Sequence, residues 1–461
     1  MRRVILQEAK KLWALATPLI LAQLAQTSLG LIDTLMAGRL GREALAGVAL
    51  GSVIFNFVLI VSAGFLFAVG PLVSQAHGAG RIEEAARAAR QGLWLALALA
   101  LPCFFLFRSL GPLLQWIGQA PETVALAAAY LKAISWGLAP VLLYTALRGF
   151  LEGLADARPL VGITLLGVLL KLLATYSLMF GRWGMPELGL VGAGYGTSLG
   201  FGLMLLLIAV RIERKHRRYQ VLSGLRTPDP TILLELLRVG WPIGLGLGFE
   251  AGLFTVTALL MGLFGATALA AYQIAMQTVS FTFMVPSGIA IATSVRVGQA
   301  AGRGSPDGVA RAGVTGITLS AAFMALVALV YWLAPDFVVG LYLDGSSPER
   351  AEVAALARNF LALAALFQVF DGVQVSTAAA LRGLKDTRIP MLLALVSYWL
   401  LGVPIGAALA FLLAVGSYGL WLGLVIGLAS AALLLLWRFR RVVRRWSRLG
   451  VEGHVLPGSV G

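Results

Sequence analysis

The chain has 461 residues, of which 59% are apolar and 12% are charged, and its formal net charge is +15. An ordinary soluble domain carries about twice that charged fraction, so the composition excludes a soluble enzyme, a disordered chain and a secreted disulfide scaffold. Lipid is therefore the expected solvent, and the sequence predicts an all-α membrane protein. The single cysteine, Cys103, leaves no disulfide within the chain to be expected.

Twelve apolar runs follow one another along the chain, each long enough to cross the hydrocarbon of a bilayer. They lie near residues 12–37, 45–72, 92–117, 124–147, 159–181, 188–210, 232–262, 268–294, 313–334, 353–380, 389–414 and 417–438. An even number of spans places both termini on the same side of the membrane. With a cytoplasmic N-terminus, 28 of the 36 basic residues lie in inside segments and six in outside segments. This bias predicts cytoplasmic termini, and it explains the basic charge without a nucleic-acid partner.

The sequence repeats itself at a shift of about 224 residues. Pro18 falls on Pro242, and the block Gln75–Gly80 falls on Gln299–Gly304. Each half holds six spans, so the halves are predicted to be parallel six-helix lobes related by a pseudo-two-fold axis along the membrane normal. We predict an N-terminal lobe at residues 1–210 and a C-terminal lobe at 232–440, joined by an inter-lobe linker at 211–231. A basic cytoplasmic tail follows at 441–461.

Three acidic residues lie well inside apolar spans, namely Asp33, Glu250 and Asp371. An ionisable group in a membrane costs about 3 kcal/mol or more, so such residues usually face a cavity and serve transport. A local polar contact between helices is the alternative. We predict that the three acids serve transport by binding a cation or a proton. Glu250 and Asp371 lie in the same half, where two carboxylates could bind a cation or share a proton.

Other polar and aromatic residues within the spans are candidates to support substrate binding or coupling. Lys171 is in the middle of the fifth span, where we predict an ion pair with Asp33; a neutral amine and a water-filled cavity are the alternatives. Gln26 falls on Glu250 in the repeat, so both halves place a polar group at one depth. Aromatic faces beside carboxylates suit flat organic cations. The further candidates are Thr175, Gln273, Gln277, Phe367 and Gln374.

The chain contains none of the sequence patterns that an ATP-driven pump or an intramembrane hydrolase would need. There is no G-x-x-x-x-G-K-[ST] loop, no Cys/His metal cluster and no G-x-S-x-G. The three histidines lie outside the spans. We therefore expect a secondary transporter rather than an enzyme, with no cofactor beyond the coupling ion.

Several motifs together carry a family resemblance. They are Asp33-Thr34-Leu35-Met36-Ala37-Gly38, Phe249-Glu250, Ala270-Ala271-Tyr272-Gln273, Ser294–Gln299, Asp371-Gly372-Val373-Gln374, Ala380-Leu381-Arg382-Gly383 and Gly184–Gly189. With them the chain resembles the multidrug and toxic compound extrusion (MATE) family, most closely its NorM-like branch, over essentially its full length. The resemblance implies a twelve-helix, two-lobed antiporter of the bacterial inner membrane that exports cationic, lipophilic drugs and dyes in exchange for H⁺ or Na⁺, working as a monomer.

The resemblance also implies roles for individual residues. Asp33 matches the N-lobe acid implicated in protonation, and Glu250 and Asp371 match the C-lobe acids implicated in cation binding. The chain departs from the pattern at two places. It has Lys171 and Thr175 where NorM-like proteins usually carry two asparagines, and Phe367 where a tyrosine often precedes the span-ten aspartate.

The sequence leaves two other functions open. A lipid-linked oligosaccharide flippase or polysaccharide exporter of the same superfamily often has more spans and a basic cavity, whereas the intramembrane acids of this chain outnumber its bases. A channel would conduct ions downhill without exchange.

Overall fold

The computed structural model describes residues 2–116, 118, 120–225, 228–343 and 348–451. Within these residues every regular element is helical, and twelve helical segments are long and apolar enough to cross a membrane. Each segment overlaps one of the twelve predicted apolar runs, so the all-α prediction with twelve spans is confirmed. The predicted basic tail is outside the described residues from 452 onward, and its first part continues α16 (Ser417–Val451).

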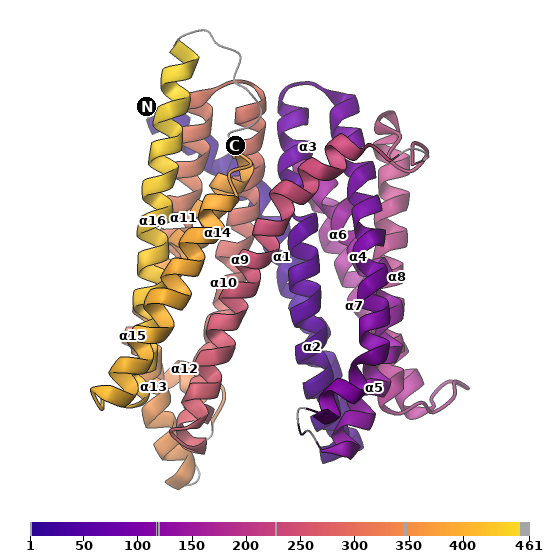
Figure 1. The fold of residues 1–461 in the computed structure, drawn as a ribbon, viewed down its shortest axis with the longest axis vertical. Coiled ribbons are helices and arrows are strands. Elements are labelled where there is room, and N and C mark those ends of the chain that lie inside the picture. The colour runs from indigo at the N-terminus through magenta and orange to yellow at the C-terminus, as the bar shows by residue number, and fades with distance from the viewer. Residues whose placement is uncertain (1, 117, 119, 226–227, 344–347, 452–461) are drawn as a thin grey trace. The chain divides into compact units, whose positions relative to one another are not determined.

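The chain forms two compact units, each defined by the packing among its own residues. Unit 2 covers Leu21–Gly244. Its long helices lie alongside one another (Figure 1). Besides parts of α1 (Arg2–Leu40) and α9 (Pro230–Gly262), it contains α2 (Arg42–Leu66), α3 (Val69–Gly78), α4 (Ile82–Trp116), α5 (Pro121–Ile134), η1 (Ser135–Gly137), α6 (Leu138–Gly153), α7 (Arg158–Phe180), α8 (Leu190–Lys215) and η2 (Arg217–Tyr219).

Unit 1 covers Met1–Ile20 and Leu245–Gly461. Besides the remaining parts of α1 and α9 and the whole of α16, it contains α10 (Ala266–Gly302), α11 (Pro306–Leu333), α12 (Pro335–Gly340), α13 (Pro348–Gly383), α14 (Arg388–Leu395), η3 (Val396–Gly402), α15 (Val403–Ala407) and η4 (Ala408–Leu412). Both η3 and η4 are π-helical. A buried aromatic group of Tyr272, Phe360, Phe367, Tyr398 and Trp421 forms part of its core.

Three spans are interrupted, and each interruption lies about one turn before a proline. The break between α2 and α3 at Phe67 precedes Pro71 by four residues, and Trp136 in η1 precedes Pro140 by the same spacing. The π-helix η3 precedes Pro404. Proline has no N–H to donate to the carbonyl four residues earlier and its ring crowds that carbonyl, so the helix changes form there.

The backbone supports the internal repeat inferred from the sequence. Gly41 and Gly265, which are 224 residues apart, precede the second span of each repeat with φ of 118° and 98°. Gly80 and Gly304 follow the same spans with φ of 73° and 65°. These left-handed angles are strained for a residue with a Cβ. Glycine is therefore required at equivalent places in both halves.

Equivalent ion pairs close the loop after the fourth span and the loop after the tenth. The Asp156 carboxylate accepts a hydrogen bond from Lys215 at 3.1 Å, and the Asp386 carboxylate accepts one from Arg438 at 2.8 Å. Each pair ties the loop to the last span of its repeat. The same architecture is therefore built twice from different basic residues.

The two packing units do not coincide with the lobes predicted from the sequence. The first turns of α1 pack with unit 1, where Arg296 near the end of α10 holds Glu8 at 2.8 Å through two nitrogens. The first half of α9 packs with unit 2. The predicted linker at 211–231 includes residues 226–227, which are outside the described residues. The lobe boundaries, which follow the sequence repeat, stay a prediction.

Candidate functional site

Four side chains from four helices of unit 2 form what we call the Asp33 cluster: Asp33, Tyr130, Lys171 and Thr197. Lys171 Nζ, Tyr130 Oη and Thr197 Oγ1 donate to Asp33 Oδ2 at 2.9, 3.1 and 3.4 Å. Lys171 Nζ also donates to the Leu29 carbonyl. Asp33 is 3% exposed and Lys171 1% exposed. The predicted ion pair is therefore present, and its charges are nearly sealed from solvent.

Small residues on α8 allow α7 to place the lysine beside Asp33. An ideal Cβ on Gly200 would lie 2.9 Å from Cβ of Lys171, and one on Gly196 would lie 2.2 Å from Oγ1 of Thr175. Such distances are too short for side-chain contacts, so both positions require glycine. Thr175 is buried, and its hydroxyl has no hydrogen-bond partner in the structure. The two residues that depart from the NorM-like pattern thus pack against one glycine face.

Five side chains of unit 1 form a second group, which we call the acid-pair cluster: Glu250, Asp371, Gln374, Arg382 and Tyr398. Glu250 and Asp371 repel each other electrostatically, whereas the Arg382 guanidinium attracts Glu250. Gln374 also interacts with Glu250, and its Nε2 donates to Tyr398 Oη at 2.8 Å. Asp371 is 3% exposed and Glu250 is half-buried. Two acids and one base give this cluster a net negative charge when all are ionised.

The π-helix η3 fixes one wall of the acid-pair cluster. It carries Tyr398, and the next residue, Trp399, donates from Nε1 to the Phe249 carbonyl at 3.2 Å. An ideal Cβ on Gly252 would lie 2.8 Å from the Trp399 ring, so glycine lets α9 approach η3. Unusual helical geometry thus positions the polar group against the helix that carries Glu250.

Several buried acceptor atoms in and beside this cluster have no hydrogen-bond partner. They are Asp371 Oδ1, Gln374 Oε1 and Ser397 Oγ. Buried polar atoms are usually paired, so each exception needs an explanation such as an ion or a moving proton. Carboxylate, amide and hydroxyl oxygens are ligands that alkali and alkaline-earth cations accept. The residues present therefore fit the binding of Na⁺ or H⁺, although no group of three acidic, histidine or cysteine residues that could hold a metal occurs in the described part of the chain.

The remaining predicted residues lie elsewhere. Gln26 accepts from Arg148 at 3.0 Å, and Arg148 is also paired with Glu152 at 2.7 Å. Gln273 and Gln277 are exposed one turn apart on α10. Phe367 is fully buried, with its ring 6.1 Å from that of Trp421 and 6.4 Å from that of Phe254. Phe367 therefore belongs to the packed core behind the acid-pair cluster.

Sequence reasoning missed the tyrosines and the arginine of these clusters. Tyr130 and Tyr398 are each unremarked aromatic residues in an apolar span, and Arg382 reads as one more cytoplasmic topology determinant. The available signal for Arg382 is its place in Ala380-Leu381-Arg382-Gly383, one of the motifs that resemble the MATE pattern. No comparable signal marks the tyrosines, because tyrosine is enriched at membrane–water interfaces whether or not it has a role in transport.

Comparison with known families decides the classification. The sequence model of the MatE family matches residues 18–177 and again 242–408. The two matches begin 224 residues apart, which is the spacing of the internal repeat. The chain belongs to the MatE family. Like other MATE proteins it is a multi-pass membrane transporter and not an enzyme, and it has their twelve-helix, two-lobed fold.

Curated relatives cover nearly the whole MATE chain. A Pseudomonas aeruginosa protein named "Probable multidrug resistance protein NorM" is 44% identical over 93% of this chain and 88% of its own length. A Synechococcus protein of the same name is 41% identical over 96% of each chain. The NorM-like resemblance is therefore confirmed.

Solved structures agree on the MATE fold. A crystal structure of a MATE protein in complex with MaL6 superposes with a TM-score of 0.88 at 22% identity, covering 96% of this chain and 97% of that one. The eukaryotic MATE transporter AtDTX14 superposes with a TM-score of 0.84 at 22% identity, covering 97% and 99%. At this identity the likeness establishes the fold alone.

Proposed function

We propose that this MATE transporter is a secondary antiporter that exports cationic, lipophilic drugs or dyes in exchange for H⁺ or Na⁺. The carrying observation is the acid-pair cluster. It places two mutually repelling carboxylates, Glu250 and Asp371, among acceptor atoms that lack partners. The relatives named multidrug resistance proteins support the substrate class.

Binding of a cation follows from the charges of the cluster. Two ionised carboxylates close together in a low-dielectric region are costly, and the single guanidinium of Arg382 offsets one of them. A proton or Na⁺ would neutralise the excess charge. A cationic drug would do the same from the substrate side, so the two cations compete for one negative charge.

Competition of this kind is required for exchange. If binding of the coupling ion and binding of the drug did not disfavour each other, the transport cycle would leak. We propose that exchange occurs by rocking of the two repeats, 1–210 and 232–440, around a fixed substrate site, with residues 211–231 as the linker that joins them. Asp33 is proposed as a second proton-binding acid, with Lys171 as its internal counter-ion.

We propose a bacterial inner-membrane location with both termini cytoplasmic. The positive-inside bias supports it. The Glu8–Arg296 ion pair joins the start of the first span to the end of the eighth, which fits an even number of spans between these two ends. We propose that the monomer is the transporting unit, since both clusters are complete within one chain.

Gradient-driven transport tests the proposal. The purified protein is reconstituted into proteoliposomes, and efflux of ethidium is followed under a Na⁺ gradient and, separately, under a pH gradient. One or both gradients should drive efflux. Glu250→Gln and Asp371→Asn should abolish it, whereas Glu352→Gln, which removes an exposed acid from the same helix as Asp371, should not. Wild-type rates in the first two variants would contradict the assignment of the acid-pair cluster.

A further inference from the structure

A cavity of about 330 Å³ opens in unit 1 between the first turns of α1, the end of α10 and the start of α11. Four basic side chains line it, from Lys11, Arg296, Arg303 and Arg311, and Glu8 is the one acidic residue of the lining. We call this the basic pocket. One of its lining residues, Arg296, belongs to the motif Ser294–Gln299, but the basic pocket is not needed for the proposed coupling.

The charges of the basic pocket are unbalanced. Glu8 holds Arg296 through two contacts of 2.8 Å, so this pair is satisfied. Arg311 donates from Nε to the Asp307 carbonyl at 3.1 Å, which is a neutral acceptor. Within the part of the chain that the structure describes, Lys11, Arg303 and Arg311 have no ion-pair partner. Three cations therefore face one cavity, and their mutual repulsion favours an anion there.

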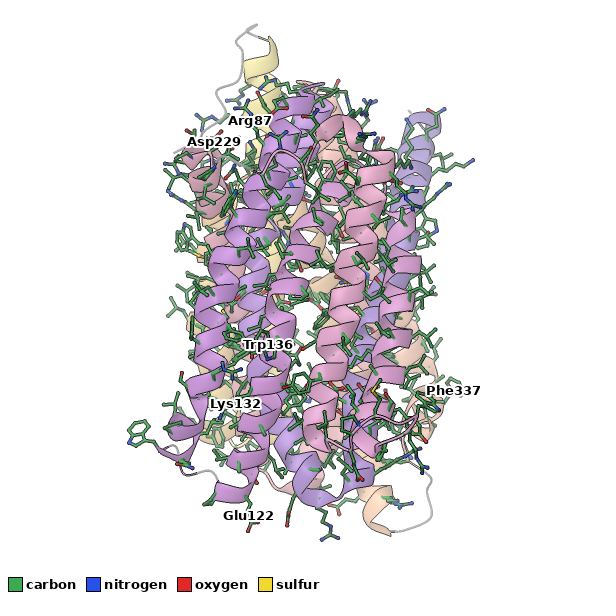
Figure 2. The ribbon with its side chains drawn as sticks, turned by 90° about the vertical axis from the view of Figure 1, so that its right-hand side faces the viewer. Arg87, Glu122, Lys132, Trp136, Asp229 and Phe337 are labelled. Atoms are coloured by element: carbon green, nitrogen blue, oxygen red, sulfur yellow. The ribbon has the colours of Figure 1, made fainter. Side chains whose placement is uncertain are left out.

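The equivalent place in unit 2 shows that the fold does not require this excess of positive charge. The shift of 224 takes Arg311 to Arg87, but it takes Arg303 to Ala79 and Lys11 to Glu235. Arg87 is paired with Asp229 at 3.6 Å, and the two labelled side chains lie together at one end of unit 2 (Figure 2). Because the repeats are parallel, both places are on the same side of the membrane. Topology alone therefore does not explain why one repeat is basic and the other balanced.

The chemistry of the lining selects a class of ligand. Guanidinium groups bind phosphate oxygens through paired N–H donors, and a lysine adds a point charge. The cavity lies at the end of spanning helices, at the depth of lipid headgroups, where basic pockets bind anionic lipid. A cationic drug would be repelled. We propose that the basic pocket binds a phosphate group, held by Arg303, Arg311 and Lys11.

Ligand-dependent stability tests this proposal on the full-length protein in a neutral detergent. The melting temperature is followed while dioctanoyl phosphatidylglycerol, dioctanoylglycerol or inorganic phosphate is added at constant ionic strength. The variant is Arg303→Gln with Arg311→Gln, and Arg303→Lys with Arg311→Lys keeps the charge. The matched control is Arg87→Gln, which removes the equivalent arginine of unit 2.

Phosphatidylglycerol should raise the melting temperature, and dioctanoylglycerol, which has the same chains without a phosphate, should not. The double glutamine variant should bind phosphatidylglycerol at least tenfold more weakly, the lysine variant should retain most of the binding, and Arg87→Gln should bind like the wild type. Stabilisation by inorganic phosphate alone, lost in the double glutamine variant, would support the same site with a soluble ligand. Equal effects of the two lipids, or undiminished binding by the double glutamine variant, would overturn the proposal.

Discussion

The two intramembrane clusters differ in how their charges are compensated. In unit 2 the Asp33 carboxylate has Lys171 at 2.9 Å and two hydroxyl donors, so groups of the protein itself compensate its negative charge. In unit 1 the Arg382 guanidinium attracts Glu250, Glu250 and Asp371 repel each other, and nearby acceptor atoms lack partners. Asp33 Oδ1 also lacks a hydrogen-bond partner, so the clusters differ in charge balance and not in unpaired atoms. The comparison teaches that the first cluster balances its charge within the protein, whereas the second carries an excess of negative charge that an additional cation could balance.

The largest effect should come from breaking the ion pair in unit 2. Lys171→Met leaves a buried carboxylate without its counter-ion, which should lower the free energy of unfolding by about 3–5 kcal/mol. Chemical denaturation in mixed micelles measures it. The double variant Lys171→Met with Asp33→Asn should regain most of the loss, because no charge is then left unpaired. An equal loss in the double variant would show that packing, and not charge, is what the lysine provides.

A smaller effect should separate the tyrosines of the two clusters. Tyr130→Phe removes a hydrogen bond to a carboxylate and should cost about 2 kcal/mol, whereas Tyr398→Phe removes one to a neutral amide and should cost about 1 kcal/mol. The same denaturation experiment compares them. A larger loss of stability in Tyr398→Phe than in Tyr130→Phe would indicate that Tyr398 stabilises the acids of unit 1 more than Tyr130 stabilises Asp33.

A still smaller change in stability should follow from removing an acid in unit 1. Asp371→Asn relieves repulsion with Glu250, so the free energy of unfolding should stay the same or rise by about 1 kcal/mol, even though transport is lost. Loss of more than about 3 kcal/mol, the cost of breaking a buried pair, would mean that Asp371 is structurally compensated, as Asp33 is.

The smallest effect concerns a loop outside the membrane. Burial of Asp156 acts against its ionised form, but hydrogen bonds from His216 and Lys215 and the charge of Arg211 hold the pKa of Asp156 below its ordinary 3.8. The ion pairs therefore stabilise the fold above about pH 4 and lose their effect as pH falls through the lowered pKa. Asp156→Asn should lower stability by about 1 kcal/mol or less at pH 7 and by less at pH 3. If Asp156→Asn lowered the free energy of unfolding equally at pH 3 and pH 7, the loss would not come from the charge of Asp156.

Much of this architecture could be predicted from the sequence because it rests on local or periodic signals. Apolar length marked the twelve spans, and the constant register of Pro18 with Pro242 marked the repeat. The ion pair of Asp33 with Lys171 could also be predicted, since two opposite charges in lipid have few other partners.

The rest depends on contacts between distant segments. The basic pocket joins Lys11 to Arg311 across 300 residues, and each of its charges alone looks like a topology determinant. The π-helix that carries Tyr398 lies just before Pro404 and packs closely against α9. The sequence of one span alone does not predict such packing. The division of α1 and α9 between two packing units is likewise a property of the folded chain.

Counter-movement of the coupling ion tests the central claim most directly. Proteoliposomes are loaded with ethidium and given no ion gradient, and the internal pH and the uptake of radioactive Na⁺ are followed as the dye leaves. The account predicts that dye efflux through the wild type draws H⁺ or Na⁺ inward and that Asp371→Asn abolishes both fluxes together. Dye efflux with no inward ion movement, or ion uptake that persists in Asp371→Asn, would contradict antiport through the acid-pair cluster.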